Sequence, residues 1–307
     1  MAVGTTTTTA TALKQYWNDF FIEQLVDSLA MKGLTKRTSV PNGNGKTVFW
    51  VGMNKVSAAG ASLSEGADPT ARSSATRRVS GSLTEYGNLI KNSRLFMDTA
   101  INGTKEQIIK DLARDAAKTL DDAVLAVALA GGTVLFAGAA THRSNIVSAS
   151  TATIKDIRKA VRLLQLSSVP RFADGFYVGL AHPDVVYDLQ TDTAWTDLVK
   201  YRDTVKWDIM GEVGKIWGVR FAVAPTIPIL VNSASASVDV YRTLIFGPDF
   251  VGQSDLGELE VIMNEPGRAS ELRQFNTYGY RFVVASAVLS NQFGIRLESS
   301  TSLGNDA

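Results

Sequence analysis

The chain has 307 residues, of which 45% are apolar and 20% charged, a mixture typical of a globular protein with a sizeable core. Its 31 basic and 30 acidic residues nearly cancel, which disfavours dedicated DNA binding because phosphate neutralisation requires a basic excess. The chain contains no cysteine, which excludes disulfides, zinc–thiolate sites and thiol nucleophiles.

The first 45 residues are predicted to form an arm. A Thr-rich start without a basic segment does not read as a signal peptide. An amphipathic helix is expected from Leu13 to Met31, followed by a polar stretch that ends in the turn-forming residues 41–45. This helix could pack on its own domain or lie across a neighbouring copy, and the sequence leaves both interpretations open.

A pair of strands with an unusually long connection comes next. Thr47–Val51 is β-branched and aromatic, and Arg78–Tyr86 alternates Val79, Gly81 and Leu83 with Ser80, Ser82 and Thr84. The connection from Ser57 to Thr76 is rich in Ala, Ser and Gly, and it is far longer than a hairpin turn. Such a loop cannot bury enough apolar surface to offset its ordering entropy. We therefore expect it to be disordered or to be ordered by contacts outside its own subunit.

The longest predicted helix begins at Thr104, where Thr104 and Gln107 form a capping-box pattern, and ends at Gly131-Gly132. About 27 residues at 1.5 Å each give a rod of roughly 40 Å. The apolar stretch Ala123–Thr141 is nearly long enough to cross a bilayer, but its glycines and the charged helix before it favour a soluble interior. The residues expected to line the buried face of the helix are Ile108, Leu112, Ala116, Leu120, Val124 and Val127.

Helices and strands then alternate without a regular repeat, which predicts an α+β fold. Thr153 is expected to cap a helix that buries Ile154, Ile157, Val161 and Leu164. A strand over Phe176–Leu180 leads to a short helix that opens at Pro183. The later strands are expected at Val219–Val223, Val240–Phe246, Tyr278–Leu289 and Gly294–Leu297, the last two as a closing pair.

No catalytic or cofactor-binding pattern is evident. Gly45-Lys46-Thr47 resembles the end of a phosphate loop, but Val40 replaces the first glycine and a strand follows where a helix is needed. His182 stands at a helix start, where capping is the ordinary role, and Asp192 is expected to be solvated. Asp121 and Asp122 point about 100° apart on a helix, so a shared metal is not expected. We predict no enzyme activity, no catalytic residue, no cofactor and no metal.

The long loop and its flanks carry both signs of charge, which suggests pairing between copies of the loop. A solvated loop of mixed charge is the alternative, since each exposed pair contributes only about 0–1 kcal/mol. The residues assigned to assembly are Leu63, Glu65, Asp68, Arg72, Arg77 and Arg78.

Four segments, in order and spacing, resemble the Hong Kong 97-type major capsid fold and within it the phage N-four-type family. Ala61–Pro69 resembles the Leu-x-Glu-Gly loop, and Glu85–Gly87 resembles the end of the return strand. Ala181–Leu189 resembles the strand-to-helix step, and Gly211–Phe221 resembles the Gly-x-Ile-x-Gly-Val-x-Phe segment. The resemblance covers essentially the whole chain.

The resemblance implies a capsid fold made of an N-arm, an extended E-loop, a P-domain with a long spine helix, and an A-domain. The implied boundaries are 1–45 for the arm, 46–90 for the E-loop and its strands, 91–133 for the P-domain with the spine helix, 134–264 for the A-domain, and 265–307 for the return to the P-domain. Some members of this family weld neighbours through an E-loop lysine. Crosslinking is not expected here, because no lysine lies between Lys55 and Lys91.

The implied function is that of a major capsid protein of a tailed phage, whose hexamers and pentamers form an icosahedral shell around packaged double-stranded DNA. The implied partners are scaffold, portal and decoration proteins, with DNA on the inner face bound without sequence specificity and no membrane. Assembly in the host bacterial cytoplasm and localisation to the virion capsid follow. The alternatives are an encapsulin-like nanocompartment shell, a soluble α+β enzyme or ligand-binding domain, and an extracellular Thr-rich surface protein.

Overall fold

A computed structural model of the chain describes the parts of the molecule that carry its three sheets and its main helices. The described residues are 31, 33–40, 45–53, 65–66, 75–99, 104–193, 195, 212–256, 260–264 and 274–304. The amphipathic segment predicted before Met31 lies outside them, as does most of the connection from Ser57 to Thr76.

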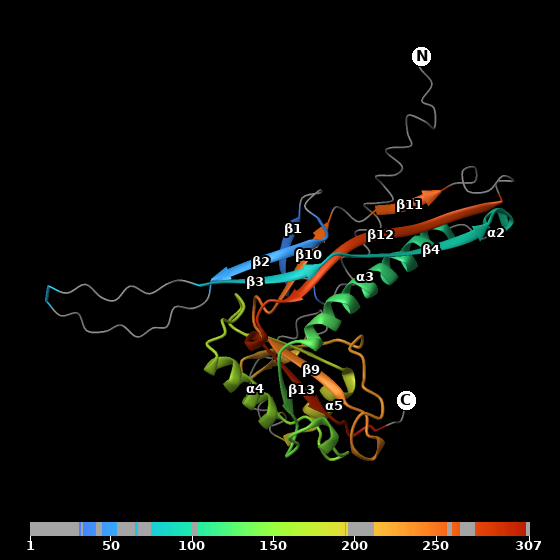
Figure 1. Cartoon of the computed structure of the whole chain (residues 1–307). Coiled ribbons are helices and arrows are strands. Elements are labelled where there is room, and N and C mark those ends of the chain that lie inside the picture. Colours follow the sequence, from blue (N-terminus) through green and yellow to red (C-terminus); the bar gives the residue numbers. More distant parts are fainter. Residues whose placement is uncertain are drawn as a thin grey trace.

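A long antiparallel sheet is built around strand β12 (Phe275–Val288). On one edge β12 pairs with β4 (Thr84–Ser93) along most of its length. On the other edge it pairs first with β11 (Glu260–Asn264) and then with β10 (Val251–Leu256). β1 (Lys36–Val40) adds a parallel strand outside β10. In Figure 1 this sheet extends away from the globular part of the molecule, with α2 (Arg94–Thr99) at its far end.

A second, six-stranded sheet forms the globular part, in the order β5-β13-β9-β6-β8-β7. Its strands are β5 (Thr133–Phe136), β6 (Tyr177–Ala181), β7 (Glu212–Ile216), β8 (Val219–Val223), β9 (Tyr241–Phe246) and β13 (Gly294–Ser299). Helices α4 (Ile154–Leu166) and α5 (Pro183–Thr191) contribute to the core on one face. The alternation along β6 places Tyr177 in this core and Val178 in a separate core on the opposite face.

The spine helix α3 (Thr104–Ala130) belongs to two cores at once. Its first half packs Ile109, Leu112 and Ala116 against the tyrosines of β12. Its second half packs Val124 and Leu129 against the second sheet. Small alanines in the first half allow the close approach of aromatic rings. Figure 1 shows the helix running from beneath the long sheet into the globular part.

The predicted limits of the spine helix are confirmed, but its buried stripe is only partly right. Leu112, Ala116 and Val124 are buried as expected, whereas Ile108 and Leu120 are half-buried. The stripe is wider than one row because the helix contacts two sheets in different directions. Gln107 does not close a capping box; its amide donates to Asp111 at 3.0 Å.

The expected closing strand pair is wrong. β12 and β13 belong to different sheets and are separated by a short 3-10 turn, Asn291–Phe293. Gly294, which follows the turn, packs so closely on Phe250 that a Cβ there would lie 2.4 Å from its ring. That approach directs the chain from one sheet into the other. A pattern of alternation within each strand carries no information about which sheet receives it.

The return strand also differs from its prediction. It leaves the two-stranded sheet of β2 (Thr47–Met53) and β3 (Thr76–Ser82) after Ser82, and after Leu83 it continues as β4 in the long sheet as far as Ser93. Strands β1, β5, β7, β10 and β11 were not predicted. No helix within the described parts of the chain is both long and apolar enough to cross a membrane. Accordingly, the stretch Ala123–Thr141 is divided between the end of α3, strand β5 and a loop.

Candidate assembly surface

The two-stranded sheet of β2 and β3, called the ribbon below, projects from the side of the long sheet (Figure 1). On its inner face Val48 and Trp50 are buried against β12 residues and Leu83. On its outer face Phe49, Val51 and Met53 are exposed, Val51 at 71% and Met53 at 79%. The strand is therefore apolar on both faces, although the described part of the subunit covers only one. An exposed apolar face of this kind is typical of surfaces that contact another molecule.

Three of the six residues predicted for assembly are described. Arg78 lies on the outer ribbon face, where its guanidinium stacks 3.4 Å from the centre of the Phe49 ring. Arg77 lies on the inner face, opposite Gly52, and is exposed. Glu65 is exposed in a turn with Gly66, whose positive φ of 81° suits a glycine. Leu63, Asp68 and Arg72 lie outside the described residues.

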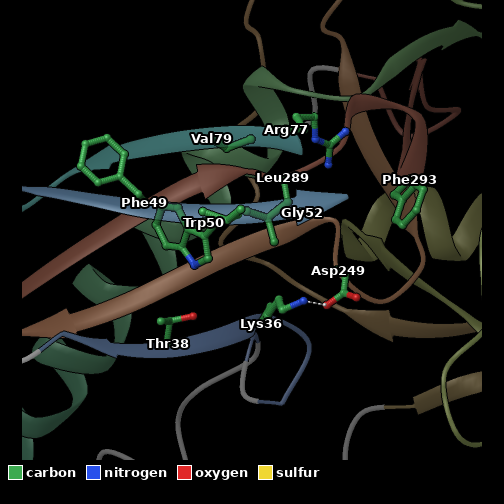
Figure 2. A pocket seen from close by; sticks show the side chains of 11 residues that line it. Lys36, Thr38, Phe49, Trp50, Gly52, Arg77, Val79, Asp249, Leu289 and Phe293 are labelled. Atoms are coloured by element: carbon green, nitrogen blue, oxygen red, sulfur yellow. Dashed lines mark ion pairs between the residues drawn. The ribbon is translucent and has the colours of Figure 1, made fainter. Parts of the chain in front are cut away.

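A pocket of about 370 Å³ opens beneath the ribbon, between its inner face, β1 and the loop before β10. Figure 2 shows the Trp50 ring in this pocket, with Arg77 above it and Lys36 below. Lys36 forms an ion pair with Asp249 at 3.3 Å. The buried indole N–H of Trp50 has no hydrogen-bond partner among the described residues. A buried donor without an acceptor costs free energy.

The Trp50 ring fits because glycines stand on both sides of it. A Cβ at Gly81 of β3 would lie 2.8 Å from the ring, and one at Gly252 of β10 would lie 2.9 Å from it. Larger residues at these positions would expel the indole. The pocket was not predicted from the sequence, although a tryptophan in the predicted strand Thr47–Val51 marked its position.

Further exposed apolar side chains belong to the elements at the far end of the long sheet, where α2 lies in Figure 1. Leu95 and Phe96 of α2 are exposed, Leu95 at 74%. Phe275 at the start of β12 is stacked under Lys91, whose ammonium lies 4.2 Å from the ring centre. Leu89 on β4 is also exposed. These four residues, the distal patch, form a second apolar surface that the described subunit leaves uncovered.

Between the two surfaces, a partly buried hydrogen-bond network fixes the spine helix to the long sheet. The Tyr280 hydroxyl donates to Asp115 at 2.6 Å, and Asn88 of β4 donates to the same carboxylate at 2.9 Å. Burial, together with the hydrogen bond to Asp115, raises the pKa of Tyr280 to about 12. The network joins α3, β4 and β12, so it holds the platform from which the ribbon projects.

A second network holds the other end of the spine helix. Glu298 on β13 is fully buried and accepts two hydrogen bonds from Arg143, at 2.6 and 2.7 Å. Arg296 lies 3.0 Å from the same carboxylate and also donates to the Leu129 carbonyl in the last turn of α3. This arginine therefore caps the helix C-terminus, where a cation is favourable.

The described polar groups have structural roles. His182 caps α5 as expected, because its Nδ1 accepts from the Asp184 amide at 3.3 Å. Asp192, predicted to be solvated, instead accepts from the Ile154 amide at the start of α4. Burial and the Asp184 carboxylate raise the pKa of Tyr241 to about 12. Within the described ranges, no group of three or more His, Asp or Glu side chains converges to hold a metal ion.

Comparison with known proteins agrees with this geometry. A family model described as phage capsid protein matches residues 76–295. The chain belongs to this phage capsid protein family. The matched region begins at β3 and contains the whole spine helix and the strands of both larger sheets, except β1 and most of β13.

Solved capsids have the same fold at low identity. The capsid of cyanophage P-SCSP1u is 17% identical, with 89% of each chain covered and a TM-score of 0.67. That of Ralstonia phage GP4 is 13% identical over 87% of each chain, with a TM-score of 0.69. The head of Helicobacter pylori phage KHP40 is 12% identical over 89% of this chain and 91% of that one, with a TM-score of 0.63. No curated protein matches the chain.

The predicted Hong Kong 97-type fold is therefore confirmed, and so is the function of a major capsid protein that forms the shell of the virion. The family match does not favour a nanocompartment shell or a soluble enzyme. Membership of a structural family also indicates a non-enzymatic role. The finer assignment to the N-four-type group stays a prediction.

Proposed function

We propose that copies of this capsid protein assemble into hexamers and pentamers of a closed icosahedral shell around packaged double-stranded DNA. The observation that supports this most directly is the outer ribbon face, where Phe49, Val51 and Met53 are exposed on a strand whose other face is buried. Full burial of such a side chain contributes about 1.5–3 kcal/mol. Contacts of this size, repeated around rings and between rings, stabilise a shell without any single strong interface.

The parts of the subunit have different roles in this proposal. Residues 1–45 act as an arm, 46–90 as the E-loop with its strands, 91–133 as the P-domain with the spine helix, 134–264 as the A-domain, and 265–307 as the return to the P-domain. The pairing of β10 and β11 with β12 supports a refinement, in which the A-domain ends before Val251 and both strands belong to the P-domain.

The E-loop is proposed to bridge neighbouring subunits by charge as well as by apolar contact. Glu65 and Asp68 supply acidic groups, and Arg72, Arg77 and Arg78 supply basic ones, with Leu63 as the apolar anchor. The exposure of Glu65, Arg77 and Arg78 supports this role. Each exposed pair contributes about 0–1 kcal/mol, so its effect depends on repetition around the ring.

The proposed partners are scaffold and portal proteins and, on the outer surface, decoration proteins. DNA lies against the inner face without sequence-specific contacts, which suits a subunit with 31 basic and 30 acidic residues. Assembly takes place in the host bacterial cytoplasm. The chain itself is proposed to have no catalytic activity.

Substitution of the outer ribbon face tests the role of this surface in assembly. In Val51→Ser/Met53→Ser, the free subunit should keep its stability, because both side chains are exposed in it and exposed sites usually change stability by less than about 0.5 kcal/mol. Shell yield, measured by sedimentation and negative-stain microscopy, should fall sharply. Leu166→Ser is the matched control, since Leu166 is 66% exposed at the end of α4, away from the ribbon.

Deletion of the long connection gives a second test. Removing Ser57–Thr76 should leave a folded subunit and abolish shells, because this segment joins the open ends of β2 and β3 rather than elements of either large sheet. Circular dichroism checks folding, and microscopy checks assembly. Normal shells from the deleted chain would refute the proposed bridging by the E-loop.

A further inference from the structure

The outer face of helix α4 carries a row of cations. The helix lies at the side of the globular part (Figure 1), and its exposed basic residues are Lys155, Arg158, Lys159 and Arg162. Their spacing of three and four residues places them within an arc of roughly 100° and along about 10 Å of the helix. The one acidic residue of α4, Asp156, is buried. The near-neutral total of the chain therefore includes a local excess of positive charge.

Most of these cations do not stabilise α4 itself. Lys159 pairs with Asp156 at 2.8 Å, but Lys155, Arg158 and Arg162 form no ion pair or hydrogen bond with any described residue. Lys155 lies in the first turn, where the helix dipole disfavours a cation, and the last turn holds no basic residue. A row that served only the helix would show the opposite arrangement. Three cations are therefore available to an anionic partner.

One cation of the row is held by an aromatic ring from the neighbouring hairpin. The Arg158 guanidinium lies 4.4 Å from the centre of the Trp217 ring. Trp217 is 48% exposed in the two-residue turn between β7 and β8, with a φ of 49° followed by Gly218 at 85°. Such a turn favours Asn or Gly at its first position, so a tryptophan there costs stability. Stacking covers one face of the guanidinium and leaves the N–H groups in its plane able to donate.

A convex row of cations fits a phosphate backbone. The cations recur about once in each helical turn of roughly 5.4 Å, and a DNA strand presents a phosphate about every 3.4 Å along its axis. A guanidinium can donate two parallel hydrogen bonds to one phosphate. Contacts to phosphates need no pocket and no base recognition, which suits an exposed helix face. Double-stranded DNA is also the polyanion that the proposed shell encloses.

We propose that the exposed face of α4, with Arg158 held by Trp217, binds the phosphate backbone of the packaged double-stranded DNA. The proposal rests on the proposed function and extends it, because it assigns the surface of the subunit that faces the DNA. The contacts are independent of DNA sequence and are weakened by salt. Each contact is small, and its repetition in every copy of the shell makes the sum large.

The salt dependence of DNA binding tests the proposal. Dissociated subunits are titrated with a short labelled DNA duplex, and fluorescence anisotropy gives the affinity at several salt concentrations. In Lys155→Gln/Arg158→Gln/Arg162→Gln, the slope of log affinity against log salt should become shallower by about 2 to 3, because each phosphate contact contributes about 0.9. An unchanged slope would overturn the proposal.

A matched control separates a local site from the net charge of the subunit. Arg94→Gln/Arg114→Gln/Lys118→Gln removes the same charge from exposed positions on α2 and α3. Its slope should stay close to that of the unaltered chain. An equal change of slope in both triple variants would show that net charge alone governs binding, and the proposal would be wrong. Circular dichroism checks that both variants are folded.

Trp217→Asn tests the positioning of Arg158 without changing any charge. Asparagine suits the positive φ of this turn, so the subunit should remain folded. DNA affinity should fall about two- to fivefold, which corresponds to the loss of one exposed cation–π contact. The salt slope should not change, because the number of cations is the same. Unaltered affinity in this variant would show that the stack has no role in binding.

Protection of a thiol beside the row identifies what covers α4 in the shell. The chain has no cysteine, and Gln165 is exposed three residues after Arg162, so Gln165→Cys introduces a single thiol there. A small maleimide should label this thiol slowly in DNA-filled shells and rapidly in the same shells after release of their DNA. Equal rates in these two states would refute the proposal. Slow labelling that persists without DNA would show that protein covers the helix instead, and the proposed function would still stand. Failure of the unaltered chain to form shells with its natural partners would contradict the proposed function itself.

Discussion

Removing the Tyr280 hydroxyl should change how the stability of the subunit depends on pH. Tyr280 is buried and donates to Asp115 at 2.6 Å, and these surroundings raise its pKa from the usual 10 to about 12. The folded pKa is therefore above the unfolded one. The stabilisation is fully present below pH 10 and is lost as the pH rises from 10 to 12, because the unfolded chain then releases its proton first.

The size of the effect follows from the shift. Each unit of pKa corresponds to 1.36 kcal/mol, so the shift of Tyr280 corresponds to about 2–3 kcal/mol of unfolding free energy. Tyr280→Phe should cost a similar amount at pH 8, because a hydrogen bond to a charged group contributes about 1.5–3 kcal/mol. The penalty should shrink towards zero near pH 12, where the unaltered chain has lost the same stabilisation.

Urea unfolding of dissociated subunits at pH 8, 10, 11 and 12, followed by tryptophan fluorescence, measures this directly. Lysine and other groups also titrate in this range, so the informative quantity is the difference between the variant and the unaltered chain at each pH. Tyr187→Phe is the control, since Tyr187 is 51% exposed and its removal should leave the pH dependence unchanged. Parallel stability curves for Tyr280→Phe and the unaltered chain would refute the reasoning.

The two other predictions concern the packing and ionic anchors of the spine helix. Leu112→Ala should cost about 2–5 kcal/mol of unfolding free energy because Leu112 is buried between α3 and the long sheet, and Leu120→Ala should cost less because Leu120 is half-buried; equal costs in urea unfolding would contradict this packing. Glu298→Gln should cost about 3 kcal/mol, because Arg143 and Arg296 would lose a buried anionic partner. A thermal midpoint unchanged from that of the unaltered chain would show that the carboxylate charge is dispensable.

The sequence predicted those elements whose own apolar spacing marks their buried face. It did not predict strands whose burial depends on partner strands elsewhere in the chain. The helix α4 buries Ile154, Ile157, Val161 and Leu164 as its spacing predicts. Strand β10, by contrast, buries Gln253 and Ser254, so no apolar pattern marks it. Its burial comes from β1 and β12, which lie far away in the chain on either side. Pairing of this kind cannot be read from the strand itself.

The candidate surface was recognised only in part for a related reason. The charged residues of the long connection were identified by composition, but Phe49, Val51 and Met53 were not. One signal was present: apolar residues follow one another without alternation from Val48 to Val51, which is typical of a strand covered on both faces. Only the structure shows that, among the described residues, a single face is covered.

The membership of α3 in two cores has a mechanical consequence for a subunit that meets different numbers of neighbours. Tyr280 ties the first half of the helix to the long sheet, and Arg296 ties its last turn to the second sheet. We infer that the two sheets move as one stiff body, since any rotation between them must break one of these anchors. The ribbon packs its inner face on β12, so differences in local curvature fall on the contacts between subunits, such as the exposed outer face of the ribbon. A shell of stiff subunits can then bend at the contacts between subunits without deforming their cores.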